Sequence, residues 1–176
     1  MCIRDRFRRK ETFATTGTRI AVRFFGGYNL SSIDLNSESL VSEAYQKGVT
    51  MGSDLLHNEN KIPEFLVWAQ RDKNGAPLQR IQIIKGWIDN NSGRPKEKVY
   101  DVACSDGMQP DPTTNRCPDN GARVNINDCS ISTNVGSSEL KTVWKDPEFA
   151  PDDKTFYYVC LLYTSDAATN GTVGWW

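Results

Sequence analysis

The sequence predicts a mainly β protein, an antiparallel sheet or sandwich with two or three short helices. Apolar and polar residues alternate in Arg19–Phe25 and in Leu78–Ile88, with the period of two that a half-buried strand shows. Turn signals rather than helices separate the later strands, among them Asn74-Gly75 and the segment Asn90–Pro95. Strands that follow one another across turns favour antiparallel pairing.

The N-terminal elements are the end of a helix, a loop and a strand. Phe7–Glu11 is basic and is typical of the last turn of a helix, and the small residues of Thr12–Gly17 form a loop after it. The strand Arg19–Phe25 places three apolar residues on one face: Ile20, Val22 and Phe24. Gly26-Gly27 ends this strand.

Two helices are expected further along the chain. The first is Ser39–Lys47, which Ser39 caps and Gly48 stops. Its apolar stripe consists of Leu40, Val41, Ala44 and Tyr45. The residues after it, Val49–Pro63, form a loop. The second helix is the short segment Ser137–Trp144.

The remaining strands are, in chain order, Phe65–Gln70, Leu78–Ile88, Lys98–Ala103 and Phe156–Val159. We expect Leu78–Ile88 to return beside Phe65–Gln70 as a hairpin, because the Asn74-Gly75 turn lies between them. The long polar stretch Ser105–Asn127 is a loop.

Composition excludes several classes of function. The chain has 21 Lys and Arg against 22 Asp and Glu, so no nucleic-acid partner is implied. No apolar run approaches the roughly 20 residues that a membrane helix needs, so no membrane span is expected.

Both ends of the chain match translated sequencing adapter. Residues 1–6 match the translation of a transposase recognition end used in shotgun libraries, and residues 160–168 match the translation of its reverse complement. We therefore assign residues 1–6 and 160–176 to adapter and expect natural sequence from about Phe7 to Val159. The alternative takes Met1 as a true start and the Trp175-Trp176 tail as a folded terminus.

Without the adapter segments three cysteines remain: Cys104, Cys117 and Cys129. They lie in a polar stretch rich in Pro, Asp and Asn, and their spacing does not resemble a zinc site. Disulfides across polar loops fit this pattern better and favour an oxidising compartment. The alternative is three free thiols in a cytoplasmic protein.

The stretch Thr15–Arg19 is the one candidate binding site. Thr15, Thr16 and Arg19 could hold a phosphate or carboxylate, because a guanidinium donates paired charge-assisted hydrogen bonds. The alternative, which we favour, is a connector in which Arg19 pairs with a nearby acid.

No catalytic or metal-binding residue is assigned. His57 is the only histidine and is expected to be a solvated loop residue. A calcium loop is conceivable at Asp106, Asp111, Asp119, Asn120 and Asp128, but their irregular spacing favours a polar loop tied by disulfides. A sugar-binding platform is conceivable at Trp68, Trp87 and Trp144, although Trp87 is expected in the core.

Five stretches carry a resemblance to a known family: Phe7–Gly27, Gly48–Leu55, Asp72–Trp87, Val99–Gly107 and Cys117–Gly121. In the same order they resemble parts of a bacterial family catalogued as a domain of unknown function, number 3604. The resemblance covers essentially all of residues 7–159.

This resemblance implies a longer parent protein. The N-terminal part of that parent is similar to the polymerase-and-histidinol-phosphatase (PHP) class of metal-dependent hydrolases, whose His and Asp residues bind divalent metal on a barrel. Residues 7–28 would then be the end of a truncated barrel, and residues 29–159 a β-rich C-terminal accessory region. The family pattern continues past Val159 with Cys-Arg-Trp-Ser, and that cysteine would restore an even number.

Two functions follow from these expectations. In the first, the chain is the non-catalytic C-terminal portion of a periplasmic or secreted hydrolase of phosphoesters, amides or esters. It has no cofactor of its own, and its partner is the missing barrel. In the second, it is an autonomous β-sandwich binding module for carbohydrate or protein. Packing of Phe7–Arg23 into a barrel favours the first function, and a separable sandwich that binds a ligand favours the second.

Overall fold

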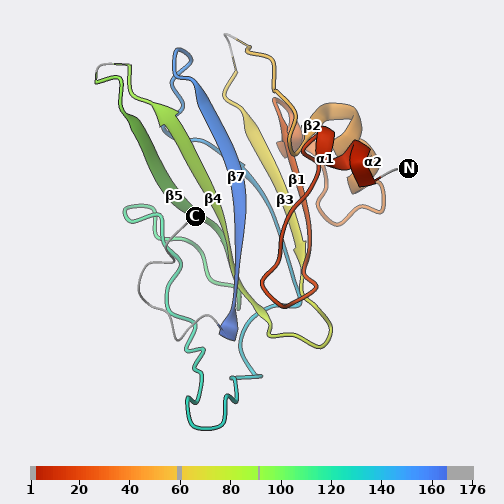
Figure 1. The fold of residues 1–176 in the computed structure, drawn as a ribbon, viewed down its shortest axis with the longest axis vertical. Coiled ribbons are helices and arrows are strands. Elements are labelled where there is room, and N and C mark those ends of the chain that lie inside the picture. The colour runs from red at the N-terminus through yellow and green to blue at the C-terminus, as the bar shows by residue number, and fades with distance from the viewer. Residues whose placement is uncertain (1–2, 59–60, 91, 166–176) are drawn as a thin grey trace.

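The computed structural model describes residues 3–58, 61–90 and 92–165, and these form two antiparallel sheets that face each other (Figure 1). Sheet A has the order β2-β1-β3-β6. Its strands are β1 (Ala21–Gly27), β2 (Gly48–Thr50), β3 (Glu64–Gln70) and β6 (Glu139–Lys145). Sheet B has the order β5-β4-β7. Its strands are β4 (Leu78–Ile88), β5 (Pro95–Cys104) and β7 (Thr155–Tyr163). The predicted antiparallel, mainly β architecture is confirmed.

The core between the sheets follows from the alternation of each strand. In β3, Phe65, Val67 and Ala69 face sheet B, and the intervening residues face the other way. The inward residues of sheet B include Ile81, Ile83, Tyr100 and Val102. Aromatic rings join the layers, since the ring centroids of Phe65 and Tyr157 are 4.3 Å apart.

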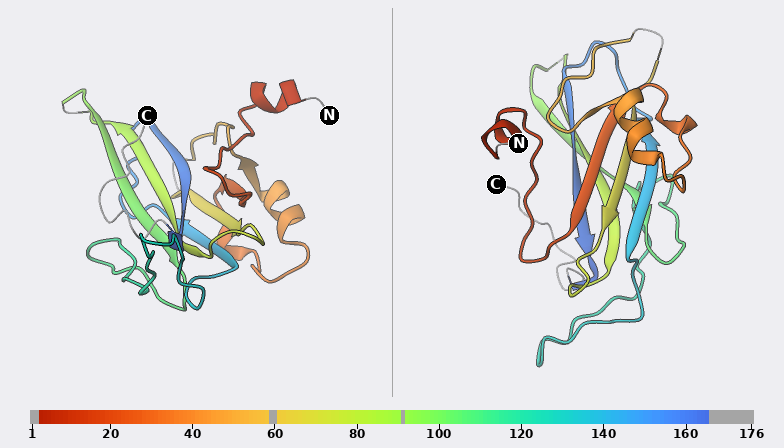
Figure 2. Two further views of the ribbon diagram at one scale, coloured as in Figure 1. Left: turned by 60° about the horizontal axis from the view of Figure 1, so that its bottom comes forward. Right: turned by 90° about the vertical axis from the view of Figure 1, so that its right-hand side faces the viewer.

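The helices are short. Helix α1 (Ile3–Arg8) ends earlier than the predicted basic helix. The helices η1 (Leu30–Ser32) and α2 (Leu40–Lys47) pack against the outer face of sheet A, as Figure 2 shows for α2. Ser39 occupies the N-cap position, but its hydroxyl donates to the Glu43 carboxylate at 2.6 Å instead of accepting a backbone hydrogen bond.

The predicted helix Ser137–Trp144 is wrong, because Glu139–Lys145 is strand β6. Its residues pair with β3 along their whole length, from Gln70↔Glu139 to Glu64↔Lys145. Leu140 and Trp144 thereby join the core between the sheets, and Val143 packs against the outer cluster of sheet A. Pairing with a distant strand has overridden a weak local helix signal.

The predicted hairpin between Phe65–Gln70 and Leu78–Ile88 is also wrong. Both strands exist, but β3 lies in sheet A between β1 and β6, whereas β4 lies in sheet B. The Asn74-Gly75 turn does form, with the Gly75 N–H donating to the Asp72 carbonyl at 3.0 Å. This turn leads the chain from sheet A to sheet B, because β1 and β6 already pair with the two edges of β3.

Strand β1 ends at Gly27, as predicted, and both Gly26 and Gly27 still pair with β2 and β3. The chain approaches closely here, since a Cβ on Gly27 would lie 2.9 Å from the Lys47 carbonyl oxygen. Strand β2 begins at Gly48, directly after the last residue of helix α2. The predicted loop Val49–Pro63 therefore begins within a strand.

Within the described residues there is no closed barrel. Residues 21–27, assigned from the sequence to the end of a barrel, form an interior strand of sheet A. Strand β7 extends past the predicted end at Val159 and pairs with β4 as far as Tyr163. Residues 166–176, including the Trp175-Trp176 tail, lie outside the described residues. No described helix is long and apolar enough to cross a membrane.

Candidate functional site: a groove between the two sheets

The unequal widths of the two sheets create a groove on one side of the sandwich. Tyr157 of β7 packs opposite Phe65 of β3, and Tyr100 of β5 packs opposite Trp144 of β6. The inner faces of β1 and β2 therefore extend beyond the edge of sheet B. A groove of about 760 Å³ lies over them.

The groove is apolar at its floor and polar at its rim. Its floor includes Phe24, Gly26, Val49, Met51 and Phe65. One wall is the first half of β7, residues 155–159, and the opposite wall is the N-terminal segment around Thr12, Phe13 and Ala14. Charged or titratable side chains line the rim: Lys10, Asp54, His57, Asp153 and Lys154. His57 is exposed there, as expected of a loop residue.

The N-terminal segment runs alongside β7 before it enters β1 (Figure 1). It contacts β7 at the far end, where the Tyr163 hydroxyl donates to the Thr16 carbonyl oxygen at 3.1 Å. The same hydroxyl lies 3.1 Å from the Thr16 hydroxyl. This contact holds the segment beside the far end of β7.

The three candidate binding residues do not line this groove. Thr15 and Arg19 are exposed, and Thr16 makes the contact with Tyr163. The backbone N–H of Arg19 donates to the Asp72 carboxylate at 2.9 Å. This hydrogen bond, a second from Asn74 and the charge of Arg19 lower the pKa of Asp72. The geometry therefore places Arg19 beside an acid of the β3–β4 connection.

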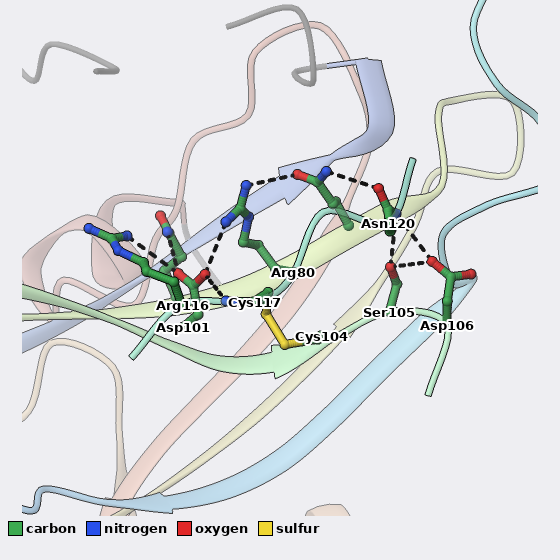
Figure 3. Close-up of a disulfide and its surroundings, with 10 residues drawn as sticks. Arg80, Asp101, Cys104, Ser105, Asp106, Arg116, Cys117 and Asn120 are labelled. Atoms are coloured by element: carbon green, nitrogen blue, oxygen red, sulfur yellow. Dashed lines mark hydrogen bonds and ion pairs between the residues drawn. A yellow bond between two sulfur atoms is a disulfide. The ribbon is translucent and has the colours of Figure 1, made fainter. Parts of the chain in front are cut away.

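Cys104 and Cys117 form a disulfide with a Cα–Cα distance of 5.7 Å (Figure 3). It ties the long polar loop to the end of β5, as expected for these two cysteines. Cys129, the third disulfide candidate, lies outside this bond and is exposed.

A buried carboxylate holds the loop next to the disulfide. Asp101 on β5 has a fully buried side chain and accepts hydrogen bonds from Arg80 at 3.0 Å and Gln82 at 2.6 Å. The backbone N–H of Cys117 donates to the same carboxylate at 2.7 Å. Figure 3 shows Arg80 and the backbone of Cys117 converging on Asp101. They fix the return of the loop to sheet B.

The acids considered as a calcium loop have separate partners. Asp106 accepts from the backbone N–H of Gly136, and Asp111 accepts from those of Thr113 and Thr114. The guanidinium of Arg123 binds the carboxylate of Asp119 and lowers its pKa to about 2. The described residues contain no group of three or more His, Cys, Asp or Glu placed to hold a metal.

The three tryptophans do not form a platform. Trp144 faces the core between the sheets, while Trp68 packs at the outer face of sheet A and donates to Glu139. Trp87 was expected in the core but lies half-buried near the end of β4, outside the core cluster. A different aromatic pair, which was not expected from the sequence, lies on β7: the rings of Phe156 and Tyr158 stack 6.2 Å apart at 13°. The run Phe156-Tyr157-Tyr158 was the available signal.

Comparison with known proteins identifies a family and no individual relative. No curated protein and no solved structure matches the chain. One family model, described as a protein of unknown function (DUF3604), matches residues 1–168. The match includes residues 1–6 and 160–168, whose assignment to adapter stays a prediction. By this match, which spans nearly the whole chain, the protein belongs to the DUF3604 family of proteins of unknown function.

Proposed function

We propose that the chain is the non-catalytic, β-rich C-terminal portion of an exported PHP-like metal-dependent hydrolase. In this proposal the groove between β7 and the N-terminal segment binds an extended segment of the hydrolase barrel. The divalent metal would be bound by the barrel, where it makes a bound water nucleophilic near neutral pH. Membership of the DUF3604 family and the resemblance of that family to PHP hydrolases support the proposal that the parent protein is such a hydrolase.

The groove is the observation that carries this proposal. Strand β7 is an edge strand of sheet B, and no residue of Thr155–Tyr163 is charged. Edge strands offer backbone donors and acceptors to an added strand. The added strand would place its inward side chains over Phe24 and Met51, so we expect apolar residues at alternate positions of the bound segment.

The disulfide supports export of the parent. Disulfides persist in the periplasm and outside the cell and are rare in the cytosol. The Cys104–Cys117 bond is compatible with either exported location.

Binding between the two parts tests the proposal. The barrel of a full-length relative, expressed separately, is titrated with this chain and with its Phe13→Asp variant, which places a charge on the exposed groove wall. We expect the variant to bind at least about tenfold more weakly, roughly 1.4 kcal/mol. Ile126→Asp is the control, because Ile126 is also an exposed apolar residue but lies outside the groove. Absence of binding by the unchanged chain contradicts the proposal.

The second candidate function is carbohydrate binding, and the stacked pair Phe156 and Tyr158 supports it. The Phe156 side chain is 60% exposed, and its ring is nearly parallel to that of Tyr158. Exposed aromatic faces of this kind pack against sugar rings. Fluorescence titration with soluble polysaccharides distinguishes the two functions. Saturable binding that Phe156→Ala abolishes and Phe13→Asp preserves supports the carbohydrate module.

We also propose that residues 1–6 and 160–176 are translated adapter. The support is the match of both ends to complementary translations of one adapter. Mapping the original sequencing reads tests this directly. Reads that change to adapter at the codons of Phe7 and Val159 are expected, and genomic reads that run through both junctions contradict it.

A further inference from the structure

A lysine and an aspartate form a buried ion pair between the two sheets. Lys85 lies on β4 of sheet B, and Asp146 follows β6 of sheet A. Lys85 Nζ is 2.6 Å from Asp146 Oδ2, and the two side chains are 3% and 0% exposed. The pair therefore joins the two layers of the sandwich at a site that excludes water.

Hydrogen bonds hold both groups in fixed positions. The Tyr157 hydroxyl donates to Asp146 Oδ2 at 2.7 Å, and the backbone N–H of Glu148 donates to Asp146 Oδ1 at 2.9 Å. Lys85 Nζ also donates to the Glu148 carbonyl oxygen at 2.7 Å. Each oxygen of the carboxylate thus has its own donor, and the ammonium is directed at one of them.

Aromatic rings surround this network. Lys85 Nζ lies 5.2 Å from the centre of the Trp87 ring. The Tyr157 ring packs against Phe65 and Trp144, and Trp144 packs against Tyr100. Burial and the nearby Asp146 carboxylate raise the pKa values of Tyr157 and Tyr100, which keeps both phenols protonated. Aromatic rings therefore enclose the ion pair on its core side.

We propose that Lys85 and Asp146 condense to an amide bond that cross-links the two sheets. A proton passes from Nζ to Oδ2 along their hydrogen bond, which gives an amine and a carboxylic acid. The amine lone pair forms a bond to Cγ of Asp146. The C–Oδ2 bond then breaks, and Oδ2 leaves as water with two of the three ammonium protons. The third proton stays on the amide nitrogen, so no other reactant is needed.

The described contacts supply what this reaction requires. The Glu148 N–H stabilises the negative charge that develops on Oδ1 during attack. The Tyr157 hydroxyl binds the departing Oδ2 and can relay its proton. Reacting groups held in contact have effective concentrations on the order of 10⁵ M or more. Exclusion of bulk water favours the amide over hydrolysis.

Intact mass spectrometry of the folded, purified 176-residue chain tests the proposal. The protein is incubated at neutral pH, then reduced and denatured, so that the disulfide does not contribute to the mass. We expect a loss equal to one water molecule. Tryptic digestion should then give a branched peptide that joins residues 81–96 to residues 146–154, with no cleavage after Lys85.

Two variants locate the reaction. Lys85→Arg keeps a long cation in place but cannot condense under these conditions, so it should retain its full mass. Lys98→Arg is the matched control, because Lys98 forms an ion pair with Glu148 close by but is more exposed. It should lose one water as the unchanged chain does.

Two results overturn the proposal. One is a full mass for the folded, unchanged chain, which would leave Lys85 and Asp146 as an ordinary buried ion pair. The other is a water loss that maps elsewhere, for example to a succinimide at Asp106-Gly107, or that persists in the Lys85→Arg variant.

Discussion

The ring of Phe156 lies directly over Gly86 of the neighbouring strand. A Cβ on residue 86 would be 2.3 Å from Cζ of that ring, far inside van der Waals contact. The two residues pair across β4 and β7, so the ring fills the space that a missing side chain leaves on the outer face of sheet B.

We predict that Gly86→Ala destabilises the fold by displacing this ring. The cost should be about 1 kcal/mol, at the low end of the range for overpacking, because Phe156 can swing into solvent. Urea unfolding measures the change. In the Phe156→Ala background the same substitution should cost less. An equal cost in both backgrounds would show that the ring is not the cause.

Asp101→Ala should strongly destabilise the protein. It leaves the Arg80 guanidinium, the Gln82 amide and the Cys117 N–H without their shared acceptor. Loss of one partner of a buried ion pair costs about 3 kcal/mol or more. Chemical denaturation compares this variant with Asp119→Ala, whose carboxylate is exposed, so that its loss leaves no buried group without a partner and should destabilise the protein much less. Similar effects of the two variants would contradict the structural role of Asp101.

Removal of the disulfide should loosen the polar loop after β5. The bond closes a loop with a sequence separation of 13 residues, for which chain entropy predicts about 3 kcal/mol of stabilisation. The double variant Cys104→Ala, Cys117→Ala should have a free energy of unfolding lower by about this amount, and its loop should be cleaved more readily by protease. Cys129→Ser, the control, should change neither property.

The carboxyl group of Asp119 should titrate well below its ordinary pKa of 3.8. Two hydrogen bonds from the Arg123 guanidinium and one from the Gly121 N–H favour the charged form and lower the pKa to about 2. A lowered pKa in the folded state stabilises the protein above pH 3.8, and this contribution is lost as the pH falls towards 2.

An NMR titration of the Asp119 side-chain carboxyl measures this pKa. In the Arg123→Ala variant we expect the midpoint to return towards 3.8 and the corresponding acid-dependent loss of stability to shrink. An unchanged midpoint in that variant would assign the effect to the backbone hydrogen bond instead.

Local pattern was enough to predict most strands of this fold. The alternation around Ile81 and Ile83 marked β4 because both residues had to face the core. The same logic failed at β6, where Leu140, Val143 and Trp144 also have the spacing of a helix face. Only the pairing with β3, about 75 residues earlier, decides between the two structures.

The groove could not be predicted from the sequence. It arises because sheet A is wider than sheet B, and the order of strands depends on contacts between distant segments. The chemistry of Thr15, Thr16 and Arg19 says nothing of their neighbours, and the structure places Thr16 beside Tyr163 and Arg19 beside Asp72. Likewise, nothing local indicates that Lys85 meets Asp146.

Both sheets are completed by strands from the last quarter of the chain. Strand β6 covers the edge of β3, and β7 covers the edge of β4, only after residues 139–163 have been synthesised. Before that point the nascent chain contains two incomplete sheets, whose inner faces are apolar and whose edge strands β3 and β4 lack a partner on one side. Such long-range pairing is slow and prone to aggregation, so the chain should depend on chaperones during synthesis or export.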